Sequence, residues 1–220
     1  MKKWGLVITL VYALIVMGLL TPAFLTMVSS STPSLADFTA FYQNWGVWVI
    51  GGMFVLGQFV LLFLSVDTSQ KRMRRRSPIV LSAITVGLFL MVVTGAILLS
   101  ALVALKLDDV PVLGTLARVL ALIFVPWMVW GVLFYLLYKH SDDPVTRAVA
   151  WLFRGSVLEL LVAVPAHVIV RRRNECSAPL ATGFGIASGI AIMLMSFGPS
   201  VLLLFKKRME QYEETSTARE

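Results

Sequence analysis

Six long apolar segments run through this 220-residue chain and restrict it to a narrow class of folds. Each is near or above the roughly 20 residues that an α-helix needs to cross the hydrocarbon core of a bilayer. Their continuous apolarity is unlike the short alternating segments of a transmembrane β-barrel. The sequence therefore predicts an all-α fold, a polytopic bundle of six spanning helices. The expected spans cover residues 4–28, 45–66, 79–105, 116–138, 148–170 and 181–205.

Composition supports an integral membrane protein, because 58% of the residues are apolar and only 14% are charged. The connecting segments are too short for a soluble domain, so residues 1–205 are expected to form one transmembrane domain. The remaining residues, 206–220, begin basic and become acidic, which predicts a cytoplasmic tail. The first apolar run exceeds the core of a signal peptide, about 7 to 15 residues, so we expect it to be retained.

The basic residues are unevenly distributed between the two sides of such a bundle. With six crossings, most of them fall on the side of both termini, and positively charged loops stay in the cytoplasm. The prediction is therefore a multi-pass protein of the inner (plasma) membrane with both termini cytoplasmic. The residues that carry it are Lys2, Lys3, Lys71, Arg72, Arg74, Arg75, Arg76, Lys139, Arg147, Lys206, Lys207 and Arg208.

Arg171, Arg172 and Arg173 break this rule, because they follow the fifth span on the predicted outer side. We expect the earlier basic loop to fix the topology and anionic lipid headgroups or a partner subunit to hold the triplet. The expected partners are thus the bilayer itself and a second copy or another membrane subunit. Nucleic acid is not expected, since the basic residues sit beside the ends of spans.

The fifth span is the one that carries ionisable side chains at membrane depth: Arg154, Glu159 and His167. A helical rise of 1.5 Å per residue places Glu159 about 18 Å from each end, near the midplane. By the same reckoning Arg154 lies about 10 Å from the inner end and His167 about 6 Å from the outer end. Ionisable groups at this depth are costly and usually pair, face a polar cavity or act on something.

Arg154 and Glu159 are five residues apart, or about 140° round the helix, which makes a poor direct pair. Glu159 instead shares a face with Ser156, Ala163 and Ala166, and His167 lies close to that face. These residues give a narrow polar stripe of the kind that can line a cavity. The structural alternative is that Glu159 pairs with Arg154 of a second copy, or bonds Gln58, a tryptophan or a hydroxyl group, to fix helix packing.

Small and aromatic residues predict how the helices pack. The Gly185-x-x-x-Gly189 spacing indicates a close approach of the sixth helix to a neighbour. Trp127 and Trp130 lie three apart on the fourth span, and we expect them to pack on the small-residue faces of the second and sixth spans. Residues 196–199, Ser-Phe-Gly-Pro, are expected to break the sixth helix.

No catalytic, cofactor or metal site is predicted. Haem with two histidine ligands is excluded, because His140 and His167 sit at opposite membrane faces. The single cysteine, Cys176, excludes four-cysteine sites, and its spacing to His167 and Glu175 matches no standard zinc motif. Enzyme activity is therefore the third hypothesis.

The leading hypothesis is small-solute or proton-linked transport. A carboxyl group at membrane depth can carry a proton, and a histidine near the outer mouth changes charge near physiological pH. Glu159 is the expected proton or cation site, and Arg171, Arg172 and Arg173 are expected to attract anionic solute or lipid. The second hypothesis is a non-catalytic subunit or assembly factor of a larger membrane complex, in which the same charges pair with partner helices.

Overall fold

The computed structural model describes residues 2–28, 39, 42–67, 76–106, 116–141, 144–173 and 178–217. Within these ranges the regular elements are six helices, and their bounds agree with the expected spans to within a few residues at every end except the last. The helices are α1 (Lys2–Val28), α3 (Trp45–Asp67), α4 (Arg76–Ala104), α5 (Leu116–Tyr138), α6 (Pro144–Arg172) and α7 (Ala178–Thr217).

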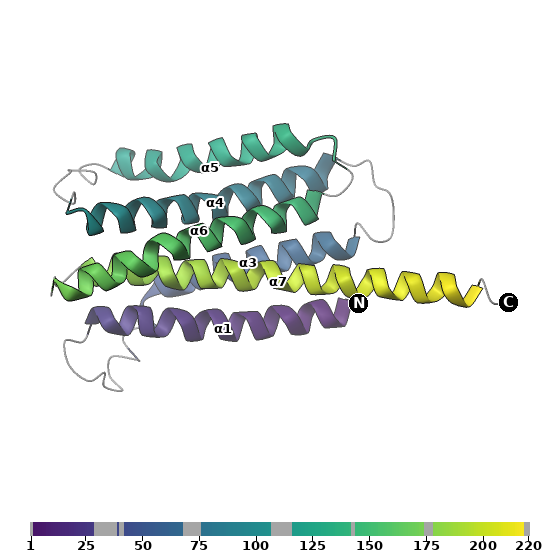
Figure 1. Cartoon of the computed structure of the whole chain (residues 1–220), viewed down its shortest axis with the longest axis horizontal. Helices are drawn as coiled ribbons and strands as arrows, with labels where there is room; N and C mark the ends of the chain where they lie inside the picture. Colours follow the sequence, from purple (N-terminus) through teal and green to yellow (C-terminus); the bar gives the residue numbers. More distant parts are fainter. Residues whose placement is uncertain are drawn as a thin grey trace.

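The helices lie side by side in one elongated bundle, and successive helices run in opposite directions (Figure 1). The start of α1 and the end of α7 lie at the same end of this bundle. α6 packs along both α4 and α7, α5 packs on α4, and α1 and α3 pack on each other and on α7. The charged helix α6 is therefore packed between α7, which follows it in the sequence, and α4, which is not next to it in the sequence.

Four helical stretches are long and apolar enough to cross a membrane: Trp45–Leu64, Ile79–Ala104, Pro144–Arg172 and Thr182–Val201. Two shorter apolar stretches in the described part of the chain are Gly5–Thr21 of α1 and Ile123–Tyr138 of α5. Large apolar side chains also point outward, for example Leu14 and Leu161, which are 68% and 65% exposed. A surface of this kind suits lipid and not water. The chain is a helical bundle built for a membrane, while the count of six crossings stays a prediction.

α7 contains Pro199 without a break, so the expectation that residues 196–199 interrupt the sixth helix is wrong. Proline removes one backbone N–H, but neighbouring groups in a membrane bundle can compensate for the lost hydrogen bond. The helix continues to Thr217 and so includes most of the residues expected to form the tail.

The tryptophans of α5 also pack differently from the expectation. Trp127 Nε1 donates a hydrogen bond to the carbonyl oxygen of Ile84 on α4, at 3.1 Å. Trp130 meets Trp151 of α6 edge-on, with ring centroids 6.0 Å apart. Because α5 lies on the outside of α4, these rings contact α4 and α6 and not the small-residue faces of α3 and α7.

Candidate functional site

One face of α6 is buried along its whole length. Its buried residues recur every three or four positions, which is the helical period, and they include Ser156, Glu159, Ala163 and Ala166. Glu159 itself has no exposed surface. The face predicted from the sequence therefore points into the bundle, toward α4 and α7.

Glu159 bonds to α7 through one carboxyl oxygen. Ser188 Oγ donates to Glu159 Oε1 at 2.6 Å, whereas Glu159 Oε2 has no hydrogen-bond partner among the described residues. Gly189 makes this approach possible, because a methyl group there would lie 3.4 Å from the Glu159 carboxyl carbon and 3.1 Å from Leu160. A buried oxygen without a hydrogen-bond partner costs free energy. Such an atom calls for an explanation, and binding of a proton or a ligand is one.

The Ser188 hydroxyl lies near three hydrogen-bond acceptors but carries one hydrogen. Besides Glu159 Oε1, its Oγ lies 2.8 Å from the carbonyl oxygen of Phe184 and 3.2 Å from that of Gly185. A hydroxyl group carries one hydrogen and can accept others. The direction of the hydrogen bond between Ser188 and Glu159 thus depends on whether the carboxyl group holds a proton.

A second unpaired polar atom, a hydroxyl of α4, lies opposite α7 about one turn from Ser188. Ser100 of α4 is fully buried and its Oγ has no partner among the described residues. It faces Gly185, where a methyl group would lie 3.0 Å from Ser100 Oγ and 3.3 Å from Ala163 Cβ. Helices α4, α6 and α7 therefore converge on small side chains at this level, in line with the close approach expected at Gly185 and Gly189.

His167 lies nearer the end of the bundle opposite the two termini. Its Nδ1 and the hydroxyl of Thr182 on α7 are 2.8 Å apart, and Thr182 is buried while His167 is half-buried. Together these groups form a line of polar side chains along α6 and its neighbours, which we call the polar seam. Its members are His167, Thr182, Ser100, Ser188 and Glu159.

The polar seam gives way to apolar side chains on the far side of Glu159. Leu152, Ile192, Met195 and Phe89 belong to one buried cluster, and each is at most 1% exposed. Ser156, one turn along α6, bonds to the carbonyl oxygen of Phe153 in its own helix. Polar side chains therefore lie between Glu159 and one end of the bundle, whereas mostly apolar side chains lie between Glu159 and the other end.

Arg154 takes no part in the polar seam. Its side chain is exposed on the outer face of α6, whereas Glu159 is buried, so the two groups lie on different sides of the helix. Arg154 makes no ion pair or hydrogen bond within the described part of the chain. The large angle between positions 154 and 159 explains this separation.

The arginine triplet lies at the ends of α4 and α6. Arg171, Arg172 and Arg173 are exposed, and the first two occupy the last turn of α6, where positive charge is favourable to the helix dipole. Arg173 Nη1 donates to the carbonyl oxygen of Ala104 at 2.8 Å. One of the three charges therefore caps a neighbouring helix, which the sequence alone did not reveal.

The described residues contain no group of three or more side chains suited to hold a metal ion. Glu175 and Cys176, which the sequence placed near His167, lie outside the described residues. The partners that sequence reasoning did not identify are Ser188, Thr182 and Ser100. The hydrogen bond from Ser188 to Glu159 is the kind of contact named in the structural alternative, in which Glu159 bonds a hydroxyl group.

The fold and this site define a class: a membrane-compatible helical bundle, as expected of an integral membrane protein, with a buried carboxyl group at a three-helix contact. No family model, curated protein or solved structure matches the chain.

Proposed function

We propose that this protein crosses the inner membrane six times, with both termini cytoplasmic, and carries protons linked to the movement of a small solute. The observation that supports this most directly is Glu159, a fully buried carboxyl group with one unpaired oxygen, which lies at the inner end of the polar seam. Ionisable groups in such positions are typical of proton relays in pumps and transporters.

Glu159 and Ser188 provide a way to bind and release a proton with little movement. When Glu159 is charged, Ser188 donates to Oε1 across 2.6 Å. When Glu159 holds a proton, its hydroxyl donates to Ser188 Oγ, and Ser188 turns its own hydrogen to the carbonyl oxygen of Phe184, 2.8 Å away. Both states are hydrogen-bonded, so the switch costs a hydroxyl rotation and no helix displacement.

The polar seam supplies a route to Glu159 from one end only. His167 and Thr182 stand near that end, and Ser100 lies between them and Ser188. On the other side of Glu159 the apolar cluster around Leu152 bars protons in this conformation. Transport then requires repacking of that cluster, as alternating access demands.

The arginine triplet suits an anionic solute. Arg171 and Arg172 are exposed beside the end of the polar seam, and fixed positive charge raises the local concentration of anions. The same positive charge repels a proton that enters the polar seam alone. A proton that enters together with an anion is repelled less. We therefore assign the solute to the anionic class, with anionic lipid headgroups as competitors for the same arginines.

The test uses the full-length protein in sealed vesicles under an imposed membrane potential, with a pH-sensitive dye inside and a panel of small anionic solutes outside. Wild type should pass protons, and Glu159→Gln, which keeps the shape but cannot exchange a proton, should reduce the flux to that of empty vesicles. Ser196→Ala is the matched control, because Ser196 is buried on α7 but bonds within its own helix. Flux in Glu159→Gln equal to wild type, with both proteins folded, would contradict the proposal.

Arg154 favours a second candidate function, that of a subunit in a larger membrane complex. Its guanidinium is exposed about 15 Å along α6 from Pro144, among apolar side chains such as Leu158 and Leu161. A charged side chain at depth is stabilised by a partner or by reaching the headgroups. Extraction in a mild detergent should then recover a stoichiometric partner that Arg154→Leu loses, and a protein recovered alone would argue against this function.

A further inference from the structure

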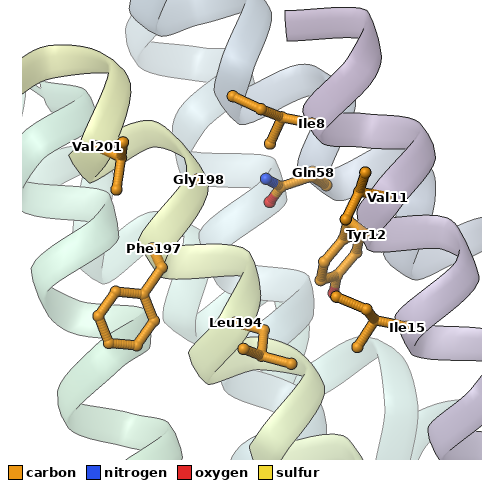
Figure 2. Close-up of a pocket in the computed structure, with 9 residues that line it drawn as sticks. All are labelled: Ile8, Val11, Tyr12, Ile15, Gln58, Leu194, Phe197, Gly198 and Val201. Carbon is orange, nitrogen blue, oxygen red and sulfur yellow. The ribbon is translucent and has the colours of Figure 1, made fainter. Parts of the chain in front are cut away.

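A cavity of about 230 Å³ lies between α1 and α7, and none of its lining residues belongs to the polar seam (Figure 2). Gln58 of α3 forms its floor, and the remaining lining is almost wholly apolar. The lining residues are Ile8, Val11, Tyr12, Ile15, Gln58, Leu194, Phe197, Gly198 and Val201.

Gln58 is out of place in this setting. It is 1% exposed, and its Oε1 has no hydrogen-bond partner among the described residues. Its amide nitrogen occupies the space where a side chain at position 198 would begin, so Gly198 is needed to admit the amide. A buried amide without its full complement of hydrogen bonds costs free energy, which a ligand that supplies the missing bond would recover.

The cavity faces the lipid side of the bundle. Val11, Phe197 and Val201 on its rim are 48%, 50% and 57% exposed, and all three are apolar. A ligand therefore enters from the membrane and not from water. The hydroxyl of Tyr12 already donates to the carbonyl oxygen of Ala191 at 2.9 Å, so Gln58 is left as the polar group that selects the ligand.

We propose that this cavity binds a membrane-soluble alcohol, a molecule with an apolar body and a single hydroxyl group that bonds to the Gln58 amide. The unpaired atom of this amide is its oxygen, which accepts hydrogen bonds and cannot donate them. A hydroxyl group donates the hydrogen bond that this oxygen lacks. A plain acyl chain would fill the apolar part and leave the amide unpaired.

The probe is a twelve-carbon alcohol that carries a photoreactive diazirine, compared with its methyl ether, which lacks the donor. Both are added to the full-length protein in lipid nanodiscs. The alcohol should label the segments 8–15 and 194–201 about two- to tenfold more strongly than the ether, the range that one hydrogen bond gives. Gln58→Met, which is apolar and similar in length, should abolish this preference.

A pair of glycine variants tests the shape of the cavity. Gly198→Ala places a methyl group against the Gln58 amide, so labelling by the alcohol should fall. Gly52→Ala on α3 is the matched control, since nothing lies within 4 Å of a methyl group there, and it should label as wild type does. Equal labelling of wild type by alcohol and ether, a preference retained in Gln58→Met, or labelling unaffected by Gly198→Ala would overturn the proposal.

Discussion

At the scale of single residues, the proposed function depends on the contact between Glu159 and Ser188. The burial of Glu159 follows from sequence, because Ser156, Glu159, Ala163 and Ala166 recur with the helical period. Its partner does not follow, because one sequence does not state the register of α6 against α7. The proposed switch depends on that register.

Removing the Ser188 hydroxyl should therefore affect both function and stability. In Ser188→Ala, Glu159 loses its one hydrogen-bond partner among the described residues, and an unsatisfied buried polar group costs about 1–3 kcal/mol. We expect a lower melting temperature and a reduced proton flux, measured in detergent and in vesicles respectively. Ser196→Ala should change both far less, since the Ser196 hydroxyl donates to the Ile192 carbonyl of its own helix. Equal effects of the two variants would deny Ser188 a special role.

At the scale of helices, hydropathy predicted the elements but not their neighbours. The bounds of α3 and α5 agree with the expected spans almost residue for residue. The contact of α6 with α4 joins helices that are not consecutive, and hydrophobic pattern carries no information about such pairs. The contacts expected for the tryptophans of α5 were wrong for this reason. The continuity of α7 through Pro199 agrees with the rule that proline interrupts a helix less readily within a membrane bundle than in water.

The contact between α4 and α5 depends on Gly87. A methyl group at Gly87 would lie 2.8 Å from the backbone nitrogen of Gly131 and 2.9 Å from the carbonyl oxygen of Trp127. Backbone atoms cannot turn aside, so Gly87→Ala must push the two helices apart. We expect it to destabilise the protein by about 1–3 kcal/mol in a thermal or denaturant melt.

Gly95 is the matched control on the same helix. A methyl group there meets nothing within 4 Å, and alanine favours the helix over glycine. Gly95→Ala should melt at or above the temperature of wild type. If Gly87→Ala were as stable as Gly95→Ala, the close packing of α4 on α5 would be wrong.

At the scale of the whole molecule, alternation of the helices puts the start of α1 and the end of α7 on one side, and the end of α6 and the start of α7 on the other (Figure 1). In the predicted orientation, the arginine triplet at that far end is an exception to the charge rule for loops. The bond from Arg173 to Ala104 and the place of Arg171 and Arg172 in the last turn of α6 give the charges a structural reason to be there.

Cys176 offers a direct test of this orientation, because it is the single cysteine and lies in the sequence between α6 and α7. A membrane-impermeant maleimide should label it from outside intact cells. In a Cys176→Ser background, Ser216→Cys near the end of α7 should be labelled only after the membrane is opened. The reverse pattern would place both termini outside.

The most direct test of the central proposal is infrared difference spectroscopy on the full-length protein in lipid, recorded between acidic and alkaline pH. If Glu159 binds a proton within the bundle, wild type will show the carbonyl band of a protonated carboxyl group, and Ser188→Ala will shift its frequency because the hydrogen bond to Glu159 is lost. Glu159→Gln will lack the band. A band that persists unchanged in Glu159→Gln would show that the proton is held elsewhere and would contradict the proposed role of Glu159.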